Sequence, residues 1–154
     1  MFGRSISTMF DEDHDRLDAL FKSFQTLKRQ DFTQAKQAFL DFEIGLRRHV
    51  AWEEDVLFPL WERKTGMTTG GPTFVMRQEH REIGEYLEMI HRKVQAQDRA
   101  SDAEERALAD LLERHNMTEE QVLYPAMDRA TSEAERETAF KNMNEIPEER
   151  YRSS

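Results

Sequence analysis

Four histidines and two glutamates in this sequence have side chains and spacings that suit metal coordination. Twice in the chain, a His is followed four residues later by a Glu, and this spacing puts both side chains on one face of a helix. A further His precedes each of these pairs on an earlier segment. Neutral imidazole and carboxylate oxygen are natural ligands of iron, manganese and zinc. The predicted metal ligands are His14, His49, Glu53, His80, His115 and Glu119.

The candidate ligands belong to an internal duplication with a shift of 66 positions. The shift superimposes residues 49–63 on residues 115–129 without a gap, and the two segments share His, Glu-Glu, Val-Leu, Pro and Arg. It also superimposes His14 on His80. If a pseudo-twofold axis relates the two halves, each half would contribute three ligands to a common centre.

The same six residues fall on apolar stripes, so they are predicted to lie in the core. A neutral polar group costs about 2–7 kcal/mol in a core without a hydrogen bond, and an unpaired carboxylate costs far more. A single core His is more often a hydrogen-bonded structural residue than a ligand. Six polar core positions that the shift of 66 relates to one another have no such simple explanation. Metal coordination would offset the free-energy cost of burying all six.

The elements that must position these ligands are helices. Apolar residues recur every three or four positions from residue 8 to residue 130, which predicts an all-α fold. Four long amphipathic helices with short connections favour an antiparallel up-down-up-down four-helix bundle. The predicted helices cover residues 8–28, 32–64, 73–97 and 101–130, followed by a short fifth helix at 132–143 and a loosely ordered polar tail at 144–154.

Three local features refine this prediction. The sequence S-x-x-E at Ser101 and again at Ser132 predicts capping boxes that open the fourth and fifth helices. The inward stripe is expected to continue beyond each His-Glu pair. Pro59 and its counterpart Pro125 each remove a backbone donor, so we expect them to kink these helices. The inward positions predicted beyond the glutamates are Val56, Leu60, Val122 and Ala126.

Length and composition limit the class of protein. A chain of 154 residues has the usual size of one domain, so we expect a single metal-binding domain over residues 1–154. The net charge of −9 and the scattered Lys and Arg disfavour nucleic acid as a partner. No apolar run approaches the roughly 20 residues that cross a bilayer, and no secretory signal is recognisable, so we expect a cytoplasmic protein without a membrane partner. Because Cys is absent, His and carboxylate are the strong ligands that remain.

The pattern resembles the hemerythrin-like domains, which are named for their His-His-Glu cation-binding motif, over about residues 8–129. The sequence H-x-x-x-E-E-x-x-L-[FY]-P, present twice, looks like the second and fourth helices of that family. The resemblance implies two iron ions with an oxo or hydroxo bridge, although a His and carboxylate set also accepts Mn or Zn. It also implies that His14 and His49 hold one ion, His80 and His115 hold the other, and Glu53 and Glu119 bridge both.

One departure from the family concerns the third helix. The oxygen-carrying hemerythrins have a further His four residues from another, but Met76 and Gly84 occupy those positions around His80. Each ion would then keep one open position. The four-His, two-Glu set is closer to the di-iron domain of the iron-sulfur repair proteins of nitrosative stress. Their Cys-containing N-terminal region is absent here, so a repair role is not carried over.

Several functions fit these observations. The first is a non-haem di-iron protein that binds or reduces a small oxidant such as dioxygen, peroxide or nitric oxide. The alternatives are a metal- or redox-responsive sensor that a protein partner reads, and an iron-handling protein without catalysis. A ferritin-like oxidase fits less well, because such sites take E-x-x-H motifs and fewer His. As an enzyme, the protein would be a di-iron oxidoreductase.

Other polar and aromatic residues near the predicted ligands are expected to have structural roles. Glu54 and Glu120 are predicted to lie on solvated helix faces, with contact to the ligands as the alternative. His91 is predicted to be a surface residue and not a ligand. Phe58 and Tyr124 are predicted to be packing residues, and Tyr124 would also form a hydrogen bond to a metal-bound ligand.

Overall fold

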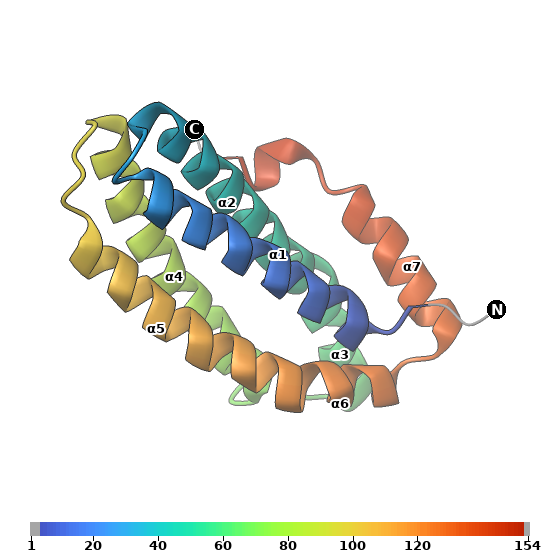
Figure 1. The fold of residues 1–154 in the computed structure, drawn as a ribbon. Helices are drawn as coiled ribbons and strands as arrows, with labels where there is room; N and C mark the ends of the chain where they lie inside the picture. Colours follow the sequence, from blue (N-terminus) through green and yellow to red (C-terminus); the bar gives the residue numbers. More distant parts are fainter. Residues whose placement is uncertain (1–3, 153–154) are drawn as a thin grey trace.

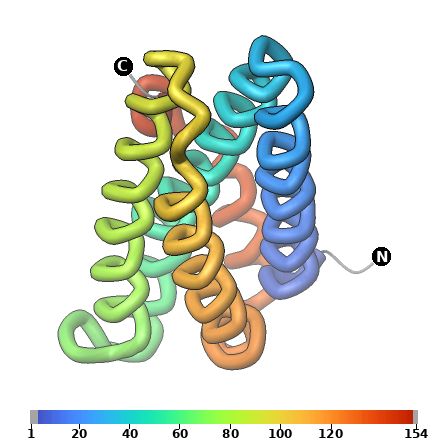
Figure 2. The backbone as a smooth tube through the Cα atoms, turned by 60° about the vertical axis from the view of Figure 1, so that its left-hand side comes forward, coloured from blue at the N-terminus to red at the C-terminus, as the bar shows by residue number. Residues whose placement is uncertain are grey.

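The computed structural model describes residues 4–152, and these residues form helices and connecting segments without a strand. The all-α prediction is confirmed. Figures 1 and 2 show the long helices lying lengthwise beside one another, with α1 packed against α2 and α4 against α5. The first half contains α1 (Ile6–Leu27), α2 (Phe32–Trp52), η1 (Glu53–Leu57) and α3 (Phe58–Thr65). The second half contains α4 (Pro72–Gln95), α5 (Asp102–Thr118), η2 (Glu119–Leu123) and α6 (Tyr124–Ala130), and α7 (Glu133–Asn144) and η3 (Glu148–Arg150) follow.

The two predicted capping boxes have different outcomes. The box at Ser132 is confirmed, because its side chain accepts from the backbone of Glu135 and the Glu135 side chain accepts in return. The prediction of a capping box at Ser101 was wrong, because the Ser101 side chain makes no capping hydrogen bond. There the Ser101 hydroxyl donates to Glu105 Oε2 at 2.5 Å, and Glu105 is buried against Lys28 at 2.6 Å. Because the Ser101 side chain binds the carboxylate of the buried ion pair, it does not cap the helix.

Each His-Glu pair leads directly into a five-residue π-helical turn. The turn η1 begins at Glu53 and η2 begins at Glu119, and in each the amide five residues on donates to the carbonyl of the glutamate. A proline follows each turn at the second position of the next helix. Proline has no N–H, and its ring crowds the carbonyl four residues earlier, so a wider turn accommodates it. The structure has these turns where the sequence predicts kinks.

The π turns displace the inward stripe by one residue. Each turn adds a residue to the helical repeat, so the face that packs inward beyond the glutamate is not the one that an α-helix would present. In η2, for example, Val122 is 56% exposed although it is predicted to face inward. The prediction was therefore wrong for Val122, whereas Val56, Leu60 and Ala126 are partly buried, with Val56 and Leu60 packed against core residues. The residues that follow them by one position, Leu57, Trp61, Leu123 and Met127, are fully buried.

The polar ligand layer separates two apolar clusters. One cluster includes Phe21, Phe39 and Leu87, and the other includes Phe10 and Leu123. Along α1, residue 10 belongs to one cluster and residue 21 to the other, with His14 between them. The candidate ligands therefore lie in a water-poor layer, where interactions between charges are stronger than in solvent.

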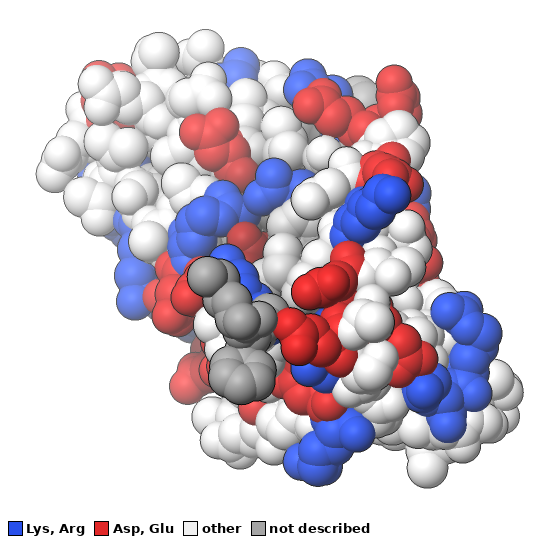
Figure 3. Space-filling model, turned by 90° about the vertical axis from the view of Figure 1, so that its right-hand side faces the viewer, with Lys and Arg blue, Asp and Glu red and all other residues white. Residues whose placement is uncertain are grey.

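The C-terminal segment folds back onto η1. The guanidinium of Arg150 donates to both carboxylate oxygens of Asp55 at 2.9 and 3.1 Å, and lies 3.6 Å from Glu54. The prediction of a loosely ordered tail was therefore wrong for residues 148–152. On the face shown in Figure 3, acidic and basic side chains are intermixed. Within residues 4–152, no helix has the length and apolar character needed to span a membrane.

Candidate metal centre

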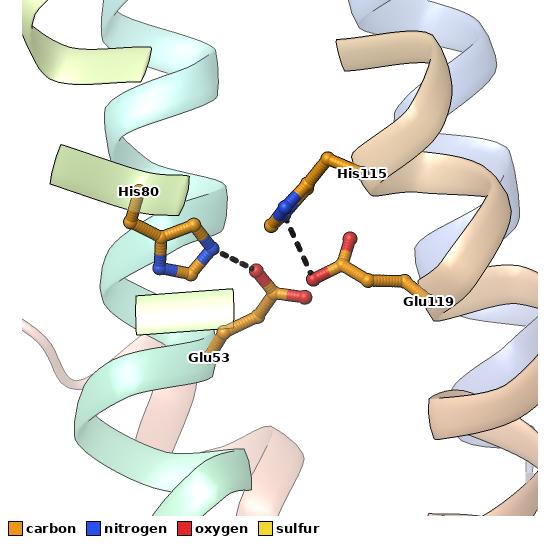
Figure 4. Close-up of side chains that lie close together, drawn as sticks. All are labelled: Glu53, His80, His115 and Glu119. Atoms are coloured by element: carbon orange, nitrogen blue, oxygen red, sulfur yellow. Dashed lines mark ion pairs between the residues drawn. The ribbon is translucent and has the colours of Figure 1, made fainter. Parts of the chain in front are cut away.

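The structure brings all six predicted ligands together in the buried layer. Figure 4 shows Glu53 and His80 pointing toward His115 and Glu119, which come from successive turns of one continuous helical ribbon. The two glutamates have no solvent exposure, and the four histidines are at most 6% exposed. We call the side of the layer with His14 and His49 the His14 half, and the side with His80 and His115 the His80 half.

The Glu119 carboxylate reaches both halves. Its Oε1 lies 3.1 Å from His14 Nε2, and its Oε2 lies 3.2 Å from His115 Nε2. One oxygen therefore faces each half, which is the arrangement needed for a carboxylate that bridges two ions.

The Glu53 carboxylate is arranged in the same way. Its Oε1 lies 3.0 Å from His80 Nε2, and its Oε2 lies 3.7 Å from His49 Nε2. The duplication therefore produces two carboxylates in equivalent positions, each with one oxygen on either side.

All four histidines have their other ring nitrogen occupied by a carboxylate. Each Nδ1 donates across 2.7 or 2.8 Å, which holds the ring with its Nε2 toward the centre. We call the four acceptors the outer carboxylates. The pairs are His14 with Glu120, His49 with Asp13, His80 with Glu54, and His115 with Glu79.

The outer carboxylates correct the sequence-based expectations. Glu54 and Glu120 were predicted to lie on solvated faces, but their carboxylates face ligand histidines of the opposite half. Asp13 and Glu79 were missed. Each directly precedes a candidate ligand, and the shift of 66 relates them, so an acidic residue before the lone His in both halves was the available signal.

Donor atoms without partners indicate that these residues fit metal ions. Within the described part of the chain, Glu53 Oε1, His80 Nε2 and Glu119 Oε2 are buried and make no hydrogen bond. The distance from His80 Nε2 to Glu53 Oε1 is short, but its direction is poor for a hydrogen bond. A cation among these atoms would remove the cost of leaving them unpaired. Donor atoms of Glu53, His80, His115 and Glu119 lie within 4.8 Å of one another, as do those of His14, His49 and Glu119.

Comparison with known families agrees with this geometry. The model of the family described as the hemerythrin HHE cation binding domain matches residues 5–139. This stretch is most of the chain and contains all six candidate ligands. The chain belongs to the hemerythrin HHE cation-binding domain family. The resemblance noted in the sequence is therefore confirmed, and the protein is a member of a metal-binding family.

This hemerythrin domain is also similar to part of some curated proteins. It is 40% identical over 50 residues to the iron-sulfur cluster repair protein YtfE of Yersinia pseudotuberculosis serotype IB (strain PB1/+), and 38% identical over 50 residues to YtfE of Yersinia pestis (strain Pestoides F). Each match covers 32% of this chain and 23% of the relative, so the chain matches less than a quarter of the length of these relatives. No solved structure matches the chain.

In this hemerythrin domain, two of the candidate ligand histidines, His14 and His80, hold protons strongly. Burial lowers the pKa of His14, but hydrogen bonds to Glu119 and Glu120 outweigh it and raise the pKa to about 9. The same balance raises the pKa of His80 to about 10. Burial, together with the negative charge of Glu119, raises the pKa of the Glu53 carboxyl. Because metal ions bind the deprotonated groups, they would displace these protons.

The two halves of the hemerythrin domain differ at one aromatic position. Tyr124 is fully buried, and its hydroxyl lies 2.7 Å from Glu53 Oε2 and 2.8 Å from Glu119 Oε1. Its counterpart Phe58 stacks on His80 with ring centroids 5.7 Å apart. The packing prediction is therefore confirmed for Phe58 and for Tyr124, which belongs to the same apolar cluster as Phe10, and Tyr124 also makes polar contacts with the candidate ligands.

Two cavities related by the shift of 66 reach the ligand layer from different sides. The cavity beside His14 has a volume of about 450 Å³, and the cavity beside His80 has a volume of about 330 Å³. Their equivalent linings carry opposite charges. Asp15, Asp18, Glu113 and Glu120 line the first with one cation, Lys22, whereas Arg47, Arg150 and Arg152 line the second with one acid, Glu88.

His91 belongs to none of the three groups of clustered donor atoms found among the described residues, of which the third is Asp11, His14 and Glu120. Its Nδ1 donates to Glu43 Oε1 at 2.8 Å, and the fully buried Glu43 also accepts from Arg47 at 3.1 Å. The prediction that His91 is a surface residue was therefore wrong, because a buried carboxylate holds it partly within the protein.

Proposed function

We propose that this chain is a non-haem di-iron protein that binds, senses or reduces a small oxidant, with dioxygen, peroxide and nitric oxide as the candidates. The observation that carries the proposal is the pair of carboxylates that each present one oxygen to either half of a His-rich layer. Mononuclear sites have no need of this arrangement. The helices would act as an antiparallel up-down-up-down bundle that forms one domain over residues 1–154.

The ligand assignment follows the two halves. The His14 half would hold one iron ion and the His80 half the other, with both glutamates as bridges. Imidazole nitrogen and carboxylate oxygen suit iron, and the relatives named for iron-sulfur cluster repair support iron over Mn or Zn. The proposed ligands are His14 and His49 for one ion, His80 and His115 for the other, and Glu53 and Glu119 for both.

The surrounding residues would prepare the site for small ligands. The outer carboxylates keep a proton on each Nδ1 and direct each Nε2 inward, so the imidazoles need not reorient when metal binds. Two iron ions would supply two electrons for the reduction of an oxidant. The cavities beside His14 and His80 would admit small molecules to this layer, while the apolar clusters above and below exclude bulk water.

A sensor is the second candidate, and the C-terminal segment favours it. Arg150 on η3 lies 3.6 Å from Glu54, which accepts from His80 Nδ1 at 2.8 Å. A change in the charge of the metal site would therefore reach a surface segment through two contacts. In this reading, a partner protein recognises the position of residues 148–152.

Metal analysis combined with visible absorption tests the proposed function. Protein reconstituted with Fe(II) without oxygen is expected to hold two irons per chain, and to change its spectrum when an oxidant is added. Catalytic consumption of peroxide or nitric oxide would favour an enzyme, and metal-dependent binding of a partner would favour the sensor. The His49→Ala, His115→Ala double variant is the control. One tightly bound metal per chain, or none, would contradict the di-iron proposal.

A further inference from the structure

The oxygen of the Tyr124 side chain lies among the donor atoms of the His14 half. Besides its contacts with Glu53 Oε2 at 2.7 Å and Glu119 Oε1 at 2.8 Å, it lies 3.2 Å from His49 Nε2 and 3.3 Å from His14 Nε2. These four atoms are the ones that the proposed function assigns to one iron ion. The Tyr124 oxygen is therefore a fifth possible donor atom, and it contacts all four donor atoms assigned to that ion.

The distances place this oxygen at a corner of a coordination polyhedron. Metal-to-ligand bonds of about 2.1 Å put neighbouring ligands of an octahedral ion about 3 Å apart. The four distances from Tyr124 bracket this value, and the separation of His14 Nε2 and Glu119 Oε1 is 3.1 Å. If the Tyr124 oxygen instead occupied the position of the metal, octahedral geometry at the observed distances would place His14 Nε2 and Glu119 Oε1 about 4 Å apart. The Tyr124 oxygen therefore lies where a ligand of the ion would lie, and not where the ion itself would lie.

The single O–H of the phenol serves only one of its two carboxylate contacts. A phenol has one O–H, so it donates to either Glu53 or Glu119 while both oxygens lie within 2.8 Å. The second contact then brings two oxygen atoms together without a proton of the phenol between them. A cation close to all three oxygens would remove this repulsion.

The π turn is what aims Tyr124 at the layer. It follows Glu119 by five residues, and in an α-helix five residues would turn it about 140° away from the Glu119 face. In η2, the amide of Tyr124 donates to the carbonyl of Glu119, so the residue lies on nearly the same face as the glutamate. The turn η1 does the same for Phe58, but Phe58 has no oxygen to offer.

We propose that Tyr124 is a fifth protein ligand of the iron ion in the His14 half, an inference that rests on the proposed two-metal site. Its phenolic proton passes to solvent as the oxygen binds the metal. The ion in the His80 half has four protein donor atoms and keeps the open coordination. A small external ligand therefore binds in the His80 half, through the cavity lined by Arg47, Arg150 and Arg152. Each arginine is paired with a carboxylate, but these partners, Glu43, Asp55 and Glu148, do not line the cavity, so an anion such as azide suits it.

The test uses all three tyrosines of the chain. Coordination of a phenolate to Fe(III) produces an intense visible charge-transfer band and enhances tyrosinate vibrations in resonance Raman spectra. Tyr124→Phe is expected to remove both signals while two irons per chain remain. The matched controls Tyr86→Phe and Tyr151→Phe should keep both signals. Phe58→Tyr places a hydroxyl at the equivalent position of the other half and should strengthen the band. Because the duplication already has Phe at this position, Tyr124→Phe should fold, and its thermal unfolding without metal verifies this.

The outcomes separate this inference from the proposed function. If the wild-type protein binds two irons without tyrosinate signals, or if Tyr124→Phe retains them, the ligand role is overturned while the di-iron proposal stands. If the wild-type protein binds no metal, both are overturned. Azide binding gives a second readout: Arg47→Ala should weaken it at least several-fold in the ferric protein, and Lys22→Ala, beside the other cavity, should not. Equal effects of the two variants would overturn the assignment of external ligands to the His80 half.

Discussion

His14 on α1 donates from Nδ1 to Glu120 Oε2 at 2.7 Å, which links the first helix to the π turn of the opposite half of the duplication. The shift of 66 relates this bond to the one from His80 to Glu54 at 2.8 Å. Each half of the chain thus orients a candidate ligand of the other half. The metal layer therefore depends on the packing of both halves, and not on either His-Glu pair alone.

Removing these outer acceptors should weaken metal binding. Glu120→Ala and Glu54→Ala leave an imidazole without the partner that holds its Nδ1 proton, and changes of this kind cost about 10–100-fold in metal affinity. Competition with a chelator of known affinity measures the change. Glu85→Ala, an exposed position on the helix that carries His80, is the control. Unchanged affinity in both variants would show that the acceptors do not support the ligands.

Replacing a ligand His in either half should reduce the metal content. His49→Ala and His115→Ala each remove one inward Nε2, so both variants should hold fewer than two irons per chain, measured on the folded fraction by elemental analysis. His91→Ala is the matched control, because His91 binds Glu43 outside the layer. Two tightly held irons in both ligand variants would refute the assignment.

The stability of the metal-free protein should fall as the pH rises above neutrality. His14 and His80 have pKa values of about 9 and about 10 in the folded protein, against an ordinary value of 6.5. The folded state therefore binds their protons more tightly than the unfolded state does. This stabilisation is complete below pH 6.5 and is lost as the pH rises through 9 and 10.

Thermal unfolding between pH 6.5 and pH 10 measures this dependence. The metal-free protein should lose stability across the window, and the iron-loaded protein should lose less, because its imidazoles bind metal in place of protons. A melting temperature that stays constant or rises across the window without metal would contradict the assignment of raised histidine pKa values.

Lys28 should support the fold without affecting the metal. Its ammonium lies 2.6 Å from the buried carboxylate of Glu105, and the two side chains are each 3% exposed. Lys28→Met would leave Glu105 buried without its cation, at a cost of about 3–5 kcal/mol in the free energy of unfolding. Lys22→Met, which breaks an exposed pair with Asp18, should have a much smaller effect, because solvent screens exposed ion pairs. Denaturant titration measures both, and a loss of iron in folded Lys28→Met would contradict its separation from the metal layer.

Local spacing was enough to predict the helices and the clustered ligands. The alternation of three and four residues predicts an all-α fold, because helical periodicity is a property of each segment by itself. The two His-Glu pairs are local in the same sense, and the shift of 66 associates them with His14 and His80. These features need no knowledge of which helix packs against which.

Contacts between helices were decided only by the tertiary structure. Asp13 precedes one ligand His in the sequence but accepts from another, His49, on the next helix. The role of Tyr124 depends on the π turn, which rotates this residue onto the face of Glu119 and moves every later inward position by one. A single added residue in the turn redirects the side chains by about 100°, and the periodicity of the sequence, read as an uninterrupted α-helix, does not contain that rotation.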